Sequence, residues 1–263
     1  MGEDQPRISV VVPTRDRPQE LQRCLAALEK QTVPVEIVVV EDVEGRGPAW
    51  ARNEGVRRAQ GEVICFTDDD CAPFPGWAAA LAKPILTDKA RATAGPTHVA
   101  TGATPADLAW EAIVSHLQGQ ATKPGTSSPG FAATANLACA RSLMKEFPFD
   151  ESFPAAAGED RDWAERATRR GDRSLFVPGA LVVHQPGLSW RGFLRQQYRY
   201  GKGAAQYRSA HRGRGFGSLF FYAGLLHRGF TSGATSGLLI CAAQVATFAG
   251  VIAAGKDRLH ASA

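Results

Sequence analysis

The first hundred residues alternate between short apolar runs and segments with helical periodicity. Three apolar, β-branched runs predict strands that are buried on both faces, at residues 8–12, 35–40 and 62–66. Two helices are expected between them, one that Pro18 opens and one over 49–59. Strands that alternate with helices predict an α/β fold with a parallel sheet and right-handed crossovers.

Polar residues follow each of these strands at the point where the strand ends. The three clusters are Pro13–Asp16, Glu41–Asp42 and Thr67–Asp70. The carboxyl ends of parallel strands meet at one edge of a sheet, and open α/β sheets bind their ligands there. We therefore expect these three loops to form one binding site.

The rest of the chain has a more mixed pattern that ends in a strongly apolar segment. The expected elements are helices at 108–117, 158–170 and 189–207, strands at 132–140 and 181–183, and a Gly/Pro/Ser/Thr-rich loop at 123–130. Gly171 follows the second of these helices, where a left-handed residue commonly ends a helix. No charged residue occurs from Thr231 to Gly255. These patterns divide the chain into two lobes, 1–100 and 101–208, and a basic, then hydrophobic, tail at 209–263.

Composition narrows the class of protein. The 263 residues are 44% hydrophobic and 21% charged, enough for a folded core in one large domain or two tightly joined lobes. The net charge of +4 is modest, and basic residues crowd towards the C-terminal part, so nucleic acid is not an expected partner. The five cysteines include no CxxC pair. They predict buried free thiols in a reducing, cytoplasmic setting, and neither a disulfide framework nor a zinc site.

The acidic triplet Asp68-Asp69-Asp70 is the most informative motif. Three adjacent carboxylates repel one another, and a divalent cation relieves that cost. Carboxylate oxygens are the ligands that Mg²⁺ and Mn²⁺ prefer, and few protein ligands leave positions for substrate phosphates. An isolated triplet is usually an exposed turn. Its position after a buried strand favours a site for a metal and a diphosphate instead.

Two further carboxylates and a histidine are candidates for catalysis or metal binding. Asp160 lies in the first turn of a predicted helix, where the helix dipole alone would explain it. Trp163 follows, which places Asp160 near a pocket wall, and we interpret it as a general base for an acceptor hydroxyl. His184 ends a strand. It is either a polar terminator or a metal or phosphate ligand.

The order of the motifs resembles family 2 glycosyltransferases. The segments that carry the resemblance are Ile8–Arg15, Glu36–Asp42, Ala51–Gly55, Phe66–Asp70, Asn136–Arg141, Phe149–Glu151 and Gly158–Asp160. The resemblance covers about residues 7–208. It implies a GT-A-type, Rossmann-like nucleotide-binding sheet flanked by helices, with a mixed acceptor-side lobe and a hydrophobic helical tail.

The resemblance also implies roles for individual residues. Asp160 would be the catalytic base, and Asp68 and Asp70 the DxD pair that faces the ribose and the metal diphosphate. The expected donor contacts are Pro13, Thr14, Arg15, Glu41, Asp42, Arg52, Asp68, Asp69 and Arg199, and the expected metal ligands are Asp70, Asp68 and His184. Gln196, Arg199 and Tyr200 are similar to the QxxRW motif of processive members. Tyr200 replaces the usual Trp, which weakens the case for polymer synthesis.

The implied reaction moves a hexose from a nucleoside-diphosphate sugar, with UDP favoured, to an acceptor hydroxyl with inversion, assisted by Mn²⁺ or Mg²⁺. Two alternatives remain open. One is a nucleotidyltransferase, which would normally show a Gly- and Arg/Lys-rich phosphate loop near the N-terminus that Pro13–Asp16 does not resemble. The other is a non-catalytic module that binds a nucleotide sugar or serves as a membrane scaffold.

The apolar segment 231–255 predicts membrane association. Leu238–Ala254 is about the shortest run that spans a bilayer, and basic residues such as Arg208 and Arg228 precede it. We expect a cytoplasmic protein at the inner face of the cell membrane, acting on a lipid-linked or glycan acceptor. The alternative is an Ala/Gly-rich helix that packs on the catalytic domain or on a second subunit.

Overall fold

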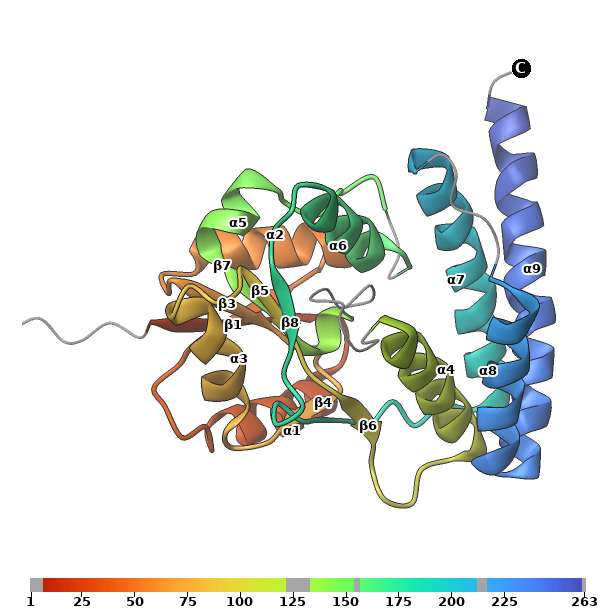
Figure 1. Cartoon of the computed structure of the whole chain (residues 1–263), viewed down its shortest axis with the longest axis horizontal. Coiled ribbons are helices and arrows are strands. Elements are labelled where there is room, and N and C mark those ends of the chain that lie inside the picture. The colour runs from red at the N-terminus through yellow and green to blue at the C-terminus, as the bar shows by residue number, and fades with distance from the viewer. Residues whose placement is uncertain (1–6, 122–132, 154–156, 212–216, 262–263) are drawn as a thin grey trace, which may run out of the picture.

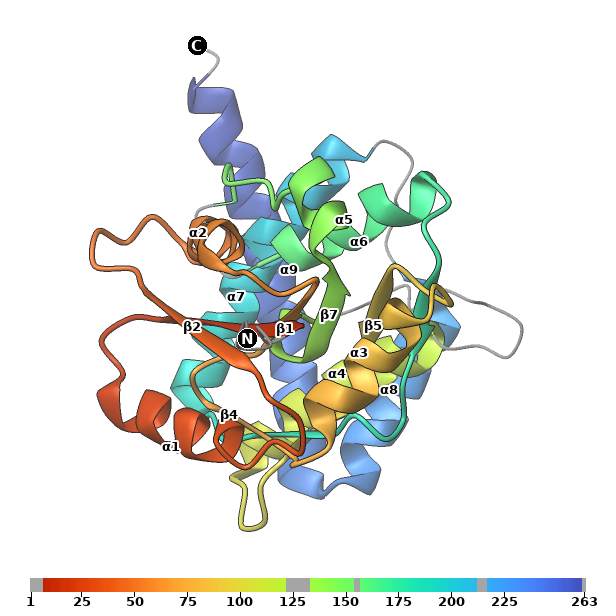
Figure 2. The ribbon, with the colours of Figure 1, turned by 90° about the vertical axis from the view of Figure 1, so that its left-hand side faces the viewer.

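A six-stranded sheet lies at the centre of the protein, with helices on both faces and a further layer of helices to one side (Figure 1). The computed structural model describes residues 7–121, 133–153, 157–211 and 217–261. Turned by 90°, the view shows the sheet in front of the C-terminal helices (Figure 2). The predicted loop at 123–130 lies outside the described residues.

The three strands expected near the N-terminus form the parallel half of the sheet. They are β1 (Ile8–Thr14), β2 (Glu36–Glu41) and β3 (Val63–Phe66), with β1 between the other two. Consecutive residues of β1 point to opposite faces, so Val10 and Val12 join one core cluster and Val11 the other. This double burial explains the continuous apolar runs.

The other half of the sheet contains strands of both directions. The strands β5 (Ala92–Ala94), β7 (Leu137–Ala140) and β8 (Ser174–Phe176) complete the order β2-β1-β3-β7-β5-β8. β7 runs antiparallel to both β3 and β5, while β5 and β8 are parallel. β7 and β8 come from the predicted second lobe. The two lobes therefore share one sheet.

The helices that flank this sheet bury one apolar side each. α1 (Pro18–Leu28) and α3 (Trp77–Leu86) contribute to the core cluster on one face. α2 (Pro48–Arg58), α5 (Arg141–Glu146) and α6 (Glu159–Arg169) contribute to the cluster on the other. Gly171, at a φ of 86°, follows α6 in the left-handed conformation predicted for it.

A small second sheet lies at the carboxyl edge of the first. It consists of β4 (Cys71–Pro73), β9 (Val182–His184) and β6 (Thr97–Val99), in the order β4-β9-β6. The strand expected over 132–140 is shorter than predicted. The short 3₁₀ helix η1 (Thr134–Asn136) precedes β7, because the backbone amide of Asn136 donates to the Ala133 carbonyl and closes a helical turn. The Asn136 side chain donates to the carbonyls of Pro96 and Ala180.

The remaining helices form a layer with its own core. They are α4 (Pro105–Ala121), α7 (Trp190–Ala210), α8 (Leu219–Thr231) and α9 (Ala234–Ala261), and they bury Trp110, Phe193, Leu225 and Ile240 together. α9 lies along α7 (Figure 1). A Cβ on Gly201 of α7 would clash with the Thr247 carbonyl, and one on Gly250 of α9 with the Tyr198 carbonyl. The backbones of α7 and α9 therefore touch.

The structure adds one observation on the C-terminal segment and one on the cysteines. One side of α9, which includes most of segment 231–255, completes the core of the helical layer. Four cysteines are buried free thiols as expected, but Cys241 on α9 is exposed.

Candidate active site

The acidic triplet follows β3 at the carboxyl edge of the sheet, and its middle residue turns into the protein. Asp69 is buried and accepts a hydrogen bond from Thr14 Oγ1 at 2.8 Å and another from Arg17 Nη1 at 3.1 Å. Burial raises the pKa of Asp69, while Thr14 and Arg17 act in the opposite direction. These contacts tie the triplet to the loop after β1. Thr14 and Asp69, which were both expected to contact the donor, are therefore hydrogen-bonded to each other.

Asp70 faces the other way, into a group of polar side chains. Its Oδ2 accepts a hydrogen bond from Arg17 Nη1 at 3.0 Å, and its Oδ1 lies 3.0 Å from His184 Nε2. Burial acts to raise the pKa of Asp70, but His184 and Arg17 outweigh it and hold that pKa below the usual value. Sequence reasoning missed Arg17, which follows Arg15 by two residues and belongs to none of the motifs singled out.

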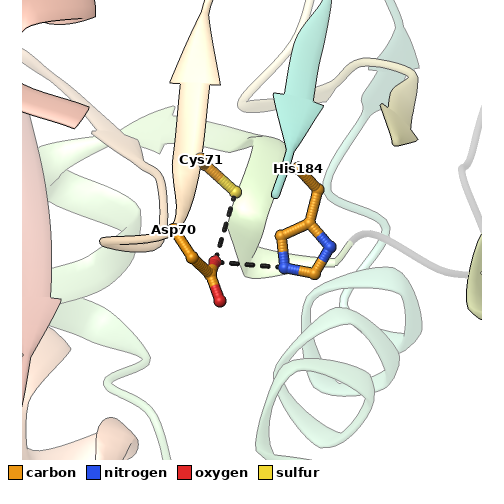
Figure 3. Close-up of side chains that lie close together, drawn as sticks. All are labelled: Asp70, Cys71 and His184. Carbon is orange, nitrogen blue, oxygen red and sulfur yellow. Dashed lines mark hydrogen bonds and ion pairs between the residues drawn. The ribbon is translucent and has the colours of Figure 1, made fainter. Parts of the chain in front are cut away.

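His184 is brought to the triplet by the small sheet. It ends β9, and its ring lies against Trp110 of α4 with the ring centroids 4.2 Å apart. Ligand atoms of Asp70, Cys71 and His184 all lie within 4.8 Å of one another (Figure 3). An oxygen, a sulfur and a nitrogen donor in this arrangement fit a divalent cation. Of the two interpretations of His184, the position beside Asp70 favours the ligand.

Arg52 joins the triplet to the second acidic motif. It is only 3% exposed, on α2, and donates to Asp68 Oδ1 from Nη2 and to Glu159 Oε1 from Nη1, both at 2.9 Å. These contacts give Arg52 a structural role that its sequence context did not reveal. The predicted contact with the diphosphate stays a prediction.

Asp160 is the second residue of α6, beside the Arg52–Glu159 pair. Gly158 caps the helix at a φ of 99°, and Glu159 turns inward to Arg52 and to the Ala157 amide. Asp160 is half-buried. Burial and the neighbouring Glu159 charge raise the pKa of Asp160 to about 7, against the opposing charge of Arg52. A carboxyl group that titrates near neutral pH is suited to general-base catalysis.

The loops after β1 and β2 hold the other predicted donor contacts. The Asp42 carboxylate is buried and accepts hydrogen bonds from the amides of Arg46 and Gly47, both at 2.7 Å. It therefore shapes the loop that leads into α2. Glu41 and Arg15 are exposed, and Pro13 is half-buried at the end of β1.

Asn53, which follows Arg52 on α2, binds a distant segment of the chain. Its side-chain amide donates to the Phe149 carbonyl and to Glu151 Oε1, both at 2.9 Å. Its Oδ1 accepts from the Phe149 amide. Asn53 therefore holds the loop that leads to α6, and this role depends on a contact between distant segments.

α7 closes the site on the side of Asp160. Burial and the charge of Asp160 raise the pKa of Tyr200. Arg199 is exposed on the same helix. Gln196 Oε1 is buried and has no hydrogen-bond partner among the described residues.

Comparison with known proteins identifies the family. The model of glycosyl transferase family 2 matches residues 43–133, and that of glycosyl transferase family group 2 matches residues 97–254. The second match covers more than half of the chain. The protein belongs to the family 2 glycosyltransferases, and its fold is of the GT-A type.

Individual relatives agree with this assignment. Glycosyltransferase AglE of Haloferax volcanii is 25% identical over 76% of this chain and 74% of its own length. The pre-mycofactocin glycosyltransferase of Mycobacterium tuberculosis is 29% identical over 75% of this chain, which spans only 47% of that relative. Among solved structures, mannosyltransferase PcManGT of Pyrobaculum calidifontis, in complex with GDP-Man and Mn²⁺, covers 92% of this chain and 74% of its own. Its TM-score is 0.56 at 20% identity.

A second structural neighbour has a similar fold. GalNAc-T7, solved with UDP, GalNAc and Mn²⁺, has a TM-score of 0.55 at 17% identity and covers 86% of this chain and 55% of its own.

Proposed function

We propose that this glycosyltransferase moves a hexose from a nucleoside-diphosphate sugar to an acceptor hydroxyl in one displacement that inverts the anomeric carbon. The observation that carries the proposal is the Arg52 bridge. It holds Asp68 of the triplet and Glu159, the neighbour of Asp160, on one guanidinium. A donor held at the triplet would thus lie beside a carboxylate whose pKa is about 7.

Asp160 would act on the acceptor. In its ionised form it accepts the proton of the acceptor hydroxyl as the oxygen attacks the anomeric carbon, and the nucleoside diphosphate leaves from the opposite face. Glu159 is bound to Arg52 and to the Ala157 amide, whereas Asp160 accepts one bond, from the Arg161 amide to Oδ1, so Asp160 is proposed as the carboxylate that receives the proton. The Tyr200 phenol would help to orient the acceptor.

The residues that would hold a divalent cation are Asp70 and His184, with Asp68 beside them. A bound Mn²⁺ or Mg²⁺ would supply positive charge for the phosphate oxygens of the donor. Arg17, whose guanidinium contacts both Asp69 and Asp70, is a further cation at the same edge. The Mn²⁺ in the GDP-Man complex of PcManGT and in GalNAc-T7 supports this proposal.

The donor is proposed to carry uracil, with Glu41, Asp42 and the Pro13–Arg15 segment nearest to the nucleoside. UDP in GalNAc-T7 and GDP-Man in PcManGT support a nucleotide sugar as the donor. The nucleotides in these two structures carry different bases, uracil and guanine, so the base of the donor has to be tested. A panel of UDP-, GDP- and dTDP-sugars measured by thermal stabilisation, with and without Mn²⁺, separates them.

Metal-dependent donor binding tests the proposal directly. In calorimetry, UDP should bind the wild-type chain in Mn²⁺ and lose affinity in EDTA, and Asp70→Ala should lose the Mn²⁺-dependent part. Glu29→Ala, at an exposed acid that ends α1, is the control and should bind as wild type does. Equal affinity with and without EDTA would remove the metal from the proposal. Donor binding with no transfer to any acceptor would instead favour a binding module.

We also propose that the protein acts at the cytoplasmic face of a membrane, on a lipid-linked or glycan acceptor. Ala234–Gly255 is long and apolar enough to cross a bilayer, with 22 residues and a mean hydropathy of 2.0. However, one side of α9 packs on α7, and α7 carries the exposed side chains Arg195 and Arg199. Crossing the membrane would take these charges into lipid. An orientation in the plane of the interface, with the apolar side of α9 towards the lipid, avoids that cost.

A further inference from the structure

Cys71 lies beside the proposed metal ligands. It is the first residue of β4, directly after the acidic triplet, and is only 2% exposed. Its Sγ lies 3.8 Å from Asp70 Oδ1, the same oxygen that lies 3.0 Å from His184 Nε2. Figure 3 shows the three side chains pointing towards one another. Arg17 contacts the other Asp70 oxygen, so Oδ1 is the one that faces the cysteine and the histidine.

Backbone pairing holds this arrangement in place. β4 and β9 are antiparallel, and Cys71 is paired with His184 in the ladder. Directly paired residues project their side chains from the same face of a sheet. Trp110 covers the His184 ring and limits its rotation. The sulfur and nitrogen are thus fixed by the sheet, while Asp70 precedes Cys71 in the chain.

The set of donor atoms differs from one made only of oxygen. Hard cations such as Mg²⁺ and Mn²⁺ select carboxylates, whereas a thiolate with an imidazole selects Zn²⁺ and other softer ions. Ligands of tetrahedral zinc lie about 3–4 Å apart, since Zn–N and Zn–S bonds are about 2.0–2.3 Å long. The three donor atoms lie within 4.8 Å of one another, so a small inward movement of side chains would close them around an ion.

Metal binding at a cysteine releases the thiol proton to solvent, so the Cys71 sulfur would bind the ion as a thiolate.

We propose that Asp70, Cys71 and His184 form a three-ligand site for a thiophilic divalent cation such as Zn²⁺, which competes there with the ion that assists sugar transfer. The inference rests on the proposed metal role of Asp70 and His184. One oxygen, one sulfur and one nitrogen bond to the ion, and the fourth position is left to water. Zn²⁺ forms stronger complexes than Mn²⁺ with such donors, so it would displace the ion that assists the reaction.

Cobalt spectroscopy of the full-length protein tests the site without any donor. A Cys24→Ala/Cys241→Ser variant removes the other buried cysteine near this edge and the exposed one, and is the reference. Co²⁺ added to it should give the near-ultraviolet charge-transfer band of a thiolate–cobalt bond. Adding Cys71→Ser should abolish the band. A parallel titration follows Mn²⁺ by its electron paramagnetic resonance signal while Zn²⁺ competes, and Cys71→Ser should reduce the preference for Zn²⁺ by roughly tenfold or more.

The outcomes separate this inference from the proposed function. Co²⁺ that binds the reference variant without a thiolate band would overturn the role of Cys71 and leave the metal role of Asp70 and His184 intact. An unchanged Zn²⁺ preference in Cys71→Ser would also overturn it. If neither Co²⁺ nor Mn²⁺ binds the wild-type chain, the metal part of the proposed function fails as well. If Cys71→Ser does not fold, as judged by its thermal transition, Cys71→Ala replaces it. The presence or absence of the thiolate–cobalt band in the reference variant then decides whether a cysteine binds the ion.

Discussion

The sheet edge and the helical layer are held together in different ways. At the sheet edge, charged side chains from distant segments neutralise one another, as Arg52 does with Asp68 and Glu159. In the helical layer, glycine backbones touch between α7 and α9, and apolar side chains fill the core. The outer side of α9 leaves large apolar residues exposed, among them Val245 at 71% and Phe248 at 57%. The first region therefore depends on charge compensation and the second on shape, and different substitutions should break each.

The largest effect is expected from Asp160→Asn at the sheet edge. The amide keeps the size of the side chain and loses its basicity, so turnover should fall by about 10²- to 10⁴-fold while donor affinity stays near that of wild type. Steady-state kinetics and calorimetry measure the two quantities. Transfer within a few-fold of wild type would eliminate Asp160 as the base.

The raised pKa of Asp160 adds a dependence on pH. Activity should fall as the pH drops below about 7, because the protonated carboxyl cannot accept a proton. A folded-state pKa above the ordinary value favours the folded state at low pH, and that contribution is lost as the pH rises from the ordinary carboxyl value of about 4 through about 7. The melting temperature of Asp160→Asn relative to wild type should therefore rise progressively from pH 4 to pH 8. A melting difference independent of pH would contradict the raised pKa.

Arg52→Met should cause the next largest effect, now on stability. It leaves Asp68 and Glu159 without their shared cation, and removing one partner of a buried ion pair typically costs about 3–5 kcal/mol. Urea denaturation measures the free energy of unfolding. Arg57→Met on the same helix is the control, because Arg57 pairs with Glu54 at the surface and should cost under about 1 kcal/mol. Equal losses of unfolding free energy in the two variants would show that the buried Arg52 bridge stabilises the protein no more than a surface ion pair does.

A glycine substitution tests the helical layer. Gly250→Val introduces a Cβ where the Tyr198 carbonyl lies, and overpacking of this kind costs typically about 1–3 kcal/mol. Gly255→Ala on the same helix meets nothing within 4 Å and should be neutral or slightly stabilising. Thermal unfolding compares them. If Gly250→Val has the same melting temperature as the wild type, α7 and α9 do not pack in the way described.

The smallest effect on stability should come from the exposed side of α9. Phe248→Ser changes a side chain that is mostly exposed and should change the free energy of unfolding by less than about 0.5 kcal/mol. It should nevertheless weaken binding to vesicles that contain anionic lipid by on the order of tenfold, because the phenylalanine no longer enters the interface. Co-sedimentation at high salt measures this binding. A wild-type chain that stays in the supernatant would argue for a helix that only packs on the protein.

The sequence alone determined the elements whose pattern is local. The parallel strands β1 to β3 were predictable because double burial requires continuous apolar runs. α6 was predictable because Gly158 and Gly171 mark its two ends. The acidic triplet and Asp160 could also be picked out, since metal and proton chemistry require carboxylates after a strand or at a helix start.

Only the tertiary structure decided which polar groups meet. Arg52 and Glu159 are 107 positions apart, and nothing local indicates that they form a pair. The inward turn of Asp69, the contact of Arg17 with the triplet and the ladder position of Cys71 opposite His184 likewise depend on packing between distant segments. The same holds for β7, whose antiparallel direction is set by its neighbours and not by its own residues. The identity of a side chain determines its chemistry, but the fold determines which group it contacts.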